Sequence, residues 1–335
     1  MTKSSAFRLQ RRTLAGLTIG LAALAIAACS GTNSTTSGAN ALPAHVPLGS
    51  ELSTTSYSYQ FVTVNDPASS TFTRVLGIDD LGEVVGYYGS GTPSDPSHGF
   101  SSSEPYTKFK TLNFPLAVNT VATSLSNTRI VAGYFEDNST GHHTFGFMRN
   151  RGVWTYYKDF KTPKGPESVN ELLGVNDSDI AVGFYKDSYG NDIPYELASG
   201  HYLALHPPGA VTAMATGINQ PGDITGVETL ASGLTEGWLL RNGTYSQFLY
   251  PGASSTQAFA INHSAVVVGS YVDSAGTHGF ILTKPGNPSG QSWQSIDEPN
   301  AVGTTVVTSI NDHDAISGWY VDSSGNTDGF VATIQ

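Results

Sequence analysis

A motif that recurs six times constrains the fold of this chain more than any other feature of its sequence. Its general form is Ile-Asn-x-x-Gly-x-Val-Val-Gly-Tyr-Tyr, and the second glycine is present in every copy. This shared glycine recurs every 43 to 50 residues, at Gly86, Gly133, Gly183, Gly226, Gly269 and Gly318. A sequence that repeats at such a period folds as an array of similar units, each packed against its neighbours.

Each repeat offers four short β runs separated by Gly, Asn, Asp and Pro turn residues. Two runs lie in the motif, a third carries a Gly-Phe pair or its equivalent, and an aromatic-led fourth run ends near proline. Four strands in 43–50 residues is the size of a propeller blade, whereas a β-helix rung is about half as long. The sequence therefore predicts an all-β fold, a six-bladed β-propeller with four antiparallel strands per blade over residues 57–335. A pair of β-sandwiches, or a five-bladed ring with a divergent extra segment, remains open.

The order of the runs predicts how the ring closes. Short glycine-containing turns join the Gly-Phe run to the aromatic-led run, so each blade begins at the strand before the motif turn and ends at the aromatic-led strand. The first β run, Tyr57–Val64, then has no blade of its own. We expect this N-terminal strand to pair with residues 329–334 as the outermost strand of the sixth blade, which would cover an exposed edge.

The first 28 residues have the pattern of an export signal. Lys3, Arg8, Arg11 and Arg12 precede an apolar stretch over residues 14–28. This stretch is shorter than the ~20 apolar residues of a membrane-spanning helix. Residues 29–56 are rich in Ser, Thr and Gly and have no hydrophobic period, which predicts a flexible tether.

The signal ends in Ile26-Ala27-Ala28-Cys29, which resembles the bacterial lipobox, and Cys29 is the only cysteine of the chain. The resemblance implies cleavage before Cys29, lipidation of its sulfur, and an exported lipoprotein. Two or three acyl chains anchor a protein stably in a membrane. Ser30 follows the cysteine instead of aspartate, which by the same resemblance implies the outer membrane or cell surface.

The repeat itself resembles the bacterial extracellular repeats of the HAF family, whose core is similar to Gly-Ile-Asn-Asp-x-Gly-x-Val-Val-Gly-Tyr followed by His-Gly-Phe. The match is closest over 261–280 and 310–330, good over 77–100, and weaker in the second, third and fourth copies. It covers the whole segment expected to fold. The resemblance implies a propeller-like repeat protein and brings no established activity with it.

Charge excludes some partner classes. Residues 1–28 hold four basic and no acidic residues, so residues 29–335 carry 12 Lys and Arg against 27 Asp and Glu, a formal net charge of −15. Because an acidic surface repels phosphates, we expect neither nucleic acid nor anionic lipid headgroups as partners.

The sequence contains no catalytic, nucleotide-binding or metal-binding motif, so we expect no cofactor and no metal site. Asn and Asp residues recur in the motif and read as turn-forming residues (Asp79, Asn127, Asn176, Asn219, Asn262 and Asn311). His98 and His278 precede Gly-Phe in two copies only, which indicates a packing slot. All four tryptophans occupy apolar positions that the repeat already requires.

Polar residues that break the repeat are better candidates for ligand contact. Four residues before the leading aliphatic residue of the motif stand Arg74, Glu171 and Gln257, whereas the other copies carry Val121, Met214 and Val306. We expect the three polar side chains to face a ligand near the central channel. The alternative is plain solvent exposure at the end of a strand.

Together these features favour a non-enzymatic binding or interaction module tethered to the cell envelope, with a glycan or an envelope protein as ligand. A hydrolase or lyase acting on polysaccharide at the channel is the main alternative, because propellers can assemble a site from residues far apart in sequence. Two buried carboxyl groups that approach closely, with raised pKa values, would favour this enzyme. A purely structural envelope protein is the third possibility.

Overall fold

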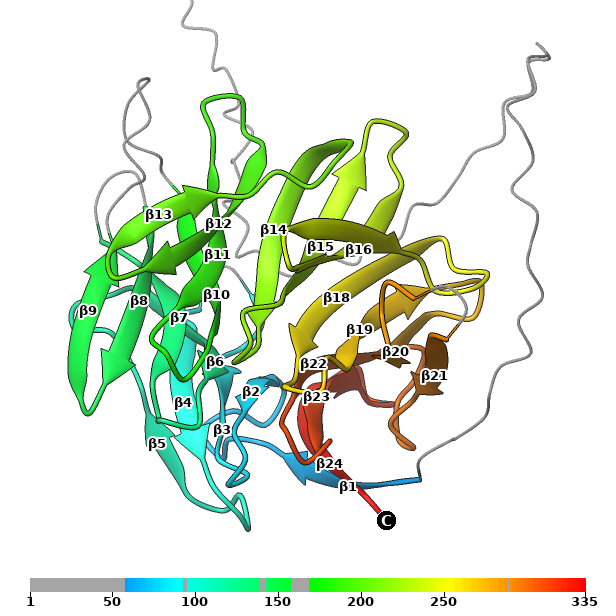
Figure 1. The fold of residues 1–335 in the computed structure, drawn as a ribbon. Coiled ribbons are helices and arrows are strands. Elements are labelled where there is room, and N and C mark those ends of the chain that lie inside the picture. Colours follow the sequence, from blue (N-terminus) through cyan, green and yellow to red (C-terminus); the bar gives the residue numbers. More distant parts are fainter. Residues whose placement is uncertain (1–57, 93–94, 139–142, 158–168, 288–289) are drawn as a thin grey trace, which may run out of the picture. The chain divides into compact units, whose positions relative to one another are not determined.

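The computed structural model describes residues 58–92, 95–138, 143–157, 169–287 and 290–335. Within these ranges every strand belongs to one of six four-stranded antiparallel sheets, and the sheets stand as blades around a ring (Figure 1). The predicted six-bladed propeller is therefore confirmed. The predictions for residues 1–28 and 29–56, including Cys29, lie outside the described residues. Over the ranges that are described, the fold includes no helix of a length and apolarity suited to crossing a membrane.

Each blade runs from an inner strand at the ring axis to an outer strand at its rim. Blades 1 to 3 are formed by β2 (Thr73–Ile78), β3 (Val84–Tyr88), β4 (His98–Ser102) and β5 (Phe109–Thr111); β6 (Asn119–Leu125), β7 (Val131–Glu136), β8 (Thr144–Asn150) and β9 (Val153–Tyr157); and β10 (Asn170–Val175), β11 (Ala181–Lys186), β12 (Asp192–Ala198) and β13 (His201–Ala204). Blades 4 to 6 are formed by β14 (Ala210–Ile218), β15 (Ile224–Leu230), β16 (Thr235–Arg241) and β17 (Thr244–Phe248); β18 (Ser255–Ile261), β19 (Val267–Val272), β20 (Thr277–Thr283) and β21 (Ser292–Ile296); and β22 (Thr305–Ile310), β23 (Ile316–Val321), β24 (Thr327–Ile334) and β1 (Tyr59–Val64).

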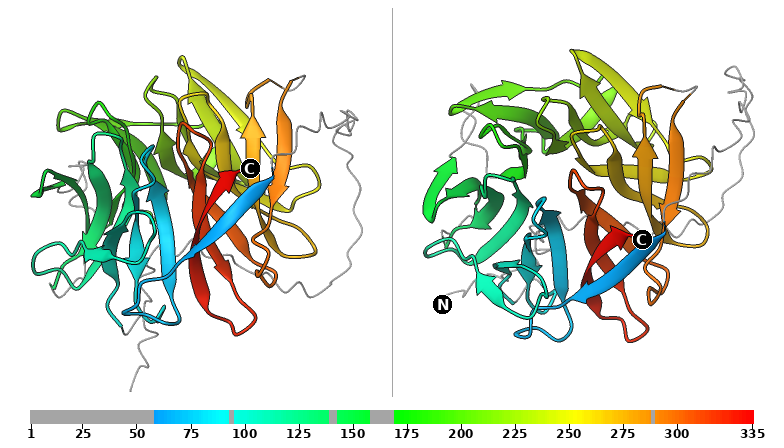
Figure 2. Two further views of the ribbon diagram at one scale, coloured as in Figure 1. Left: turned by 90° about the horizontal axis from the view of Figure 1, so that it is seen from below. Right: turned by 60° about the horizontal axis from the view of Figure 1, so that its bottom comes forward.

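The ring closes through the pairing predicted from the sequence. Strand β1 pairs antiparallel with β24, from Tyr59 opposite Ile334 to Val64 opposite Gly329. Figure 2 shows this blue strand lying beside the red C-terminal strand. The first and last strands of the propeller therefore share one blade.

The shared glycine of the repeat is required by a close backbone approach. A Cβ atom at Gly86 would lie 1.9 Å from the Arg74 carbonyl oxygen on the neighbouring inner strand. At Gly226 it would also lie 2.5 Å from the Trp238 ring. Any side chain at this position would force the two strands apart, so the glycine that identifies the repeat is a packing requirement.

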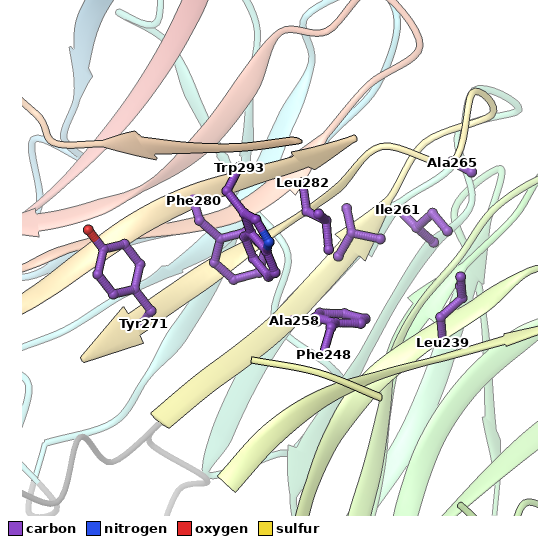
Figure 3. Close-up of a cluster of buried hydrophobic side chains, with 10 residues drawn as sticks. Leu239, Phe248, Ala258, Ile261, Ala265, Tyr271, Phe280, Leu282 and Trp293 are labelled. Carbon is purple, nitrogen blue, oxygen red and sulfur yellow. The ribbon is translucent and has the colours of Figure 1, made fainter. Parts of the chain in front are cut away.

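Aromatic residues of the Gly-Phe strands fill the space beside that glycine. In blade 5, Phe280 is fully buried and its ring lies 5.1 Å from that of Trp293 on the outer strand (Figure 3). Leu282 and Ala258 complete the same buried cluster. Six such clusters, each with residues of two neighbouring blades, include Trp154, Trp238 and Trp293, whereas the buried Trp319 packs under the Arg74 guanidinium.

A β-bulge interrupts every inner strand at the same repeat position, and the bulged residues of all six blades line one small pocket of about 90 Å³ at the axis. Blades 1, 3 and 5 place a large apolar residue there, namely Leu76, Leu173 and Phe259. Blades 2, 4 and 6 place a threonine there, namely Thr123, Thr216 and Thr308. The inner ring thus has an approximate threefold alternation of large apolar side chains and threonines around this pocket.

Candidate functional site

The repeated Asn and Asp residues are turn-forming, as predicted. In blade 3, Asn176 Oδ1 accepts hydrogen bonds from the N–H groups of Ser178 and Ile180 at 3.0 and 3.1 Å. In blade 2 the sequence assignment is wrong by one residue. There the turn is made by Ser126, whose Oγ accepts from the Ile130 N–H, while Asn127 occupies the next position. The serine hides the register of this copy because the other five copies have Asn or Asp at this position.

The same amides also join the blades. Asn176, Asn219, Asn262 and Asn311 each donate through Nδ2 to the backbone carbonyl of the equivalent residue in the next blade, at 2.9 to 3.2 Å. Asp79 has no amide to donate, and its Oδ2 is buried without a partner among the described residues. Burial raises the pKa of Asp79 above its usual range, although the Glu83 and Leu81 N–H groups oppose the shift. These residues are committed to turns and blade contacts, which leaves them little capacity for a ligand.

The three predicted ligand-facing residues lie at one repeat position in alternate blades, Arg74 in β2, Glu171 in β10 and Gln257 in β18. The Arg74 guanidinium is held by its own blade and the preceding one, 3.2 Å from the Tyr87 hydroxyl and 4.0 Å from the centre of the Trp319 ring. Gln257 is half-buried opposite Ser270. In the described part of the chain no hydrogen bond or ion pair joins any two of the three, and their action as one set stays a prediction.

Glu171 differs from the other two because it is buried, with 1% of its surface exposed. Its Oε2 has no hydrogen-bond partner in the described part of the chain. Burial raises the pKa of Glu171 to about 8, the Asp192 carboxylate adds to the increase, and the Lys186 ammonium opposes it. Burial raises the pKa of the Tyr134 hydroxyl in blade 2, and the Glu171 carboxylate in turn adds to this increase.

A second buried carboxyl group, Glu228, faces the boundary between blades 3 and 4, because its cross-strand partner Ala213 lies there. Five blades place an aromatic residue two positions after the shared glycine: Tyr88, Phe135, Tyr185, Tyr271 and Tyr320. Blade 4 places Glu228 there, 1% exposed, and neither of its carboxyl oxygens has a hydrogen bond of ordinary geometry among the described residues. Its cross-strand partner on β16 is Glu236.

Burial dominates the ionisation of this pair. It raises the pKa of Glu228 to about 7, with the Glu236 carboxylate adding to the increase and the Gln247 side chain opposing it. Burial likewise raises the pKa of Glu236. The Gln247 amide also donates to the Pro208 carbonyl at 3.3 Å.

The strand and connection beside Glu228 depart from the repeat as well. In blades 1, 2, 5 and 6 a threonine at the start of the inner strand accepts a hydrogen bond from the residue before the proline of the preceding connection. Blade 4 has Ala213 and Pro207 at these two positions, so both the acceptor hydroxyl and the donor N–H are missing. In blades 2 and 5 this pre-proline residue stacks on the aromatic residue that Glu228 replaces, as Tyr250 does on Tyr271 at 3.6 Å.

These substitutions coincide with a cavity of about 120 Å³ between blades 3 and 4. Its walls are residues 192–194 of β12, residues 205–207 of the β13–β14 connection and residues 210–213 of β14. Ala213 pairs with Glu228 across β14 and β15, and cross-strand partners project from the same face of a sheet. We name this cavity, together with Glu228 and Glu236, the blade 3–4 cleft.

Glu236 occupies the repeat position of His98 and His278, for which the sequence indicates a packing slot, and Glu228 is not among the residues predicted to face a ligand. That slot is real elsewhere, since Tyr88 packs on His98, and Tyr271 on His278, with ring centres 5.3 and 5.2 Å apart. An alignment of the six copies at the position two residues after the shared glycine would have shown Glu228 as the one charged residue among five aromatics. No group of three His, Cys, Asp or Glu residues suited to a metal ion occurs among the residues with described coordinates.

No protein-family model matches this chain, and no curated protein is similar to it. Solved structures of low identity are similar in fold. They include TolB from Acinetobacter baumannii (10% identity, TM-score 0.49, 75% of this chain and 64% of that chain), the β-propeller domain of the Trilobed protease from Pyrococcus furiosus (8%, 0.47, 78% and 95%) and the six-bladed fucose-recognising lectin of Aleuria aurantia (9%, 0.47, 78% and 90%). The chain thus covers less than two thirds of TolB. At these scores nothing about ligand or activity is carried over.

Proposed function

We propose that this protein is a non-catalytic ligand-binding propeller of the cell envelope, and that its ligand binds in the blade 3–4 cleft. The observation that carries the proposal is Glu228, a buried carboxyl group with both oxygens unsatisfied, at a position where five blades place an aromatic residue. A buried polar group without a partner costs about 1–3 kcal/mol, or more when charged. Such a group is expected where a ligand supplies the missing hydrogen bonds.

A ligand panel tests the binding role. The whole chain, purified in detergent, is unfolded thermally in the presence of glycans, amines, metal salts and envelope protein fragments. A ligand that binds only the folded state raises the unfolding midpoint in proportion to the logarithm of its concentration. The proposal requires at least one compound whose effect is lost in Glu228→Gln. Effects that are equal in the parent and in this variant would place binding elsewhere.

The envelope role rests on Cys29 and is tested separately. In the resemblance stated above, Cys29 carries the lipid and residues 29–56 form a tether. We expect the parent protein to incorporate a radiolabelled fatty acid and to fractionate with the outer membrane. Cys29→Ser should lose the label and leave the membrane fraction. A labelled variant, or an unlabelled parent, would refute lipidation at this residue.

The Glu228–Glu236 pair favours a second candidate, a hydrolase acting on polysaccharide. Cross-strand partners lie on the same face of adjacent strands, and glycosidases use two carboxyl groups that face one bond of the substrate. Both pKa values are raised, and Glu236 is partly exposed. Release of reducing sugar from a polysaccharide panel, abolished in both Glu228→Gln and Glu236→Gln, would establish the enzyme over the binding module.

A further inference from the structure

The blade 3–4 cleft holds two acidic groups without a compensating cation. Glu228 and Glu236 face each other across β15 and β16, and no ion pair includes either residue in the described ranges. No lysine, arginine or histidine lowers the pKa of either group. The nearby Asp192 carboxylate is different because it already pairs with the Lys186 ammonium. A positively charged group is therefore the partner that the Glu228–Glu236 pair lacks.

The cavity beside this pair is small, and its lining is mixed, with Asp192, His206 and Thr212 among apolar residues. Its volume of about 120 Å³ lies well below the ~300–1,000 Å³ of ordinary small-molecule pockets. Ile193 and Pro194 contribute to one wall, and Pro207 and Ala213 to the facing surfaces. Neither Glu228 nor Glu236 lines the cavity itself, but Ala213 on its wall is the cross-strand partner of Glu228 and projects from the same face of the sheet. A ligand with an aliphatic stem in the cavity and a charged end directed at the carboxyl pair has the form of a lysine side chain.

A divalent metal ion fits the same place less well. Ca²⁺ takes about six to eight oxygen ligands. The cleft offers the carboxyl oxygens of Glu228 and Glu236 and, at its edge, the exposed Gln247 amide. A single ammonium group needs only three acceptors for its three N–H donors.

We propose that the blade 3–4 cleft binds the ammonium group of an unbranched alkylamine, and that in the cell this group is a lysine side chain of a partner protein. The stem lies along Pro207 and Ala213, and the ammonium group donates to the Glu228 and Glu236 carboxyl groups. This inference rests on the proposed function, because it names the ligand class for the same site.

Calorimetric titration of the whole chain at pH 8 tests the proposal with matched probes. n-Butylamine is compared with n-butanol, and Nα-acetyl-lysine amide with its Nε-acetylated form. The amines should bind, and their neutral counterparts should bind at least ten times more weakly, since a hydrogen-bonded charge contributes about 1.5–3 kcal/mol. Binding of butylamine without binding of the lysine amide would support the ammonium site and refute the protein partner.

Variants separate the site from general effects of charge. Glu228→Gln should weaken amine binding at least tenfold. Glu228→Tyr, which restores the residue type of four other blades, should abolish binding and give a second folded variant. Asp328→Asn removes a carboxyl group at the position in blade 6 equivalent to Glu236 and should leave the affinity within twofold.

Three results would overturn the inference. They are equal binding of butylamine and butanol, undiminished amine binding in both Glu228 variants, and Glu228-dependent binding of CaCl₂ or glucose without binding of any amine. The last result would refute only the assignment of an ammonium group as ligand and would still support the proposed ligand-binding function. If no compound of the panel bound in a Glu228-dependent way, the ammonium assignment and the proposed function would both be refuted.

Discussion

At the scale of single residues, the blade-joining amide is replaced at two positions, by Ser126, whose hydroxyl contacts Thr128, and by Asp79, whose Oδ2 is buried without a partner among the described residues. The amides at the equivalent position in blades 3 to 6 donate to the next blade, and Asp79 cannot donate unless it is protonated. Its raised pKa fits this geometry, because the neutral acid has the proton that the site requires. The residue is thus tolerated at neutral pH at a cost in stability.

We predict that Asp79→Asn stabilises the protein by about 1–2 kcal/mol at pH 7, because the amide can donate to the carbonyl of Ser126. Since the pKa of Asp79 is higher in the folded than in the unfolded state, the stability of the parent falls as pH rises through the interval between the two values. The gain should therefore vanish in acid, where Asp79 is protonated in both states. Urea unfolding of the parent and of Asp79→Asn at pH 3.5, 5 and 7 measures this difference in the free energy of unfolding. A difference that does not change with pH would contradict the prediction.

Glu171 provides a pH dependence of the same sign over a wider interval. Its pKa is about 8 in the fold against 4.5 for the ordinary side chain, so stability falls from about pH 4.5 to about pH 8 and is level beyond. A shift of this size corresponds to a few kcal/mol as an order of magnitude. We predict that Glu171→Gln removes this decline in denaturant unfolding. The exposed Asp95→Asn serves as control, and parallel curves for Glu171→Gln and the parent would refute the assignment.

At the scale of elements, the bulge in each inner strand determines what the ring axis contains. In the even-numbered blades the bulged threonine reaches the next blade. Thr308 Oγ1 lies 2.8 Å from the Val75 carbonyl in blade 1 and 3.2 Å from the Ser317 carbonyl in its own blade. Thr123 and Thr216 make the equivalent contacts. The odd-numbered blades place a large apolar side chain at this position, which can make no such bond.

We predict that Thr308→Val lowers the free energy of unfolding by about 1–2 kcal/mol, because it removes a buried hydroxyl and leaves a carbonyl without a donor. The contact joins blades 6 and 1, so hydrogen exchange in β2 should accelerate together with exchange in β22. The exposed Thr244→Val on β17 is the control for β propensity. An effect confined to β22 would show that the threonine does not connect the two blades.

At the scale of the whole molecule, the sequence predicts the architecture well and the site poorly, for one physical reason. The residues that recur in every copy are those that every blade requires to fold. Gly86 and its equivalents are an example, because they permit the close approach of two backbones. The number of blades and the closure by β1 follow from such features. A ligand site depends instead on what one blade lacks. Pro207, Ala213 and Glu228 become informative only when the bulge and the strand pairings fix the register of the copies.

The bulges also explain why the channel set of Arg74, Glu171 and Gln257 was hard to evaluate from sequence. An extra residue in each inner strand changes which side chains reach the axis, and periodicity alone does not reveal it. The alternation of polar and apolar residues at this position follows the alternation of the bulged residues.

Closure of the ring by β1 gives a test at the same scale. Gln60 lies opposite Thr333, and both side chains are exposed. Antiparallel partners have Cα atoms about 4.5–5.5 Å apart, within the range that a disulfide spans. We predict that Gln60→Cys combined with Thr333→Cys forms a disulfide under mild oxidation. The only native cysteine, Cys29, is expected to be acylated and so not to compete.

This disulfide would link the first and last strands of the propeller and close a loop of more than 250 residues. Loop-closure entropy then predicts stabilisation by about 3–5 kcal/mol, less any strain in the bond. Thermal unfolding with and without reductant measures the gain, and each single cysteine variant is the control. A shift of β1 by one residue would turn position 60 to the other face of the sheet and prevent the bond. Failure to oxidise would therefore refute the register that completes the sixth blade, and a bond without stabilisation would show that the ring is not opened at this seam during unfolding.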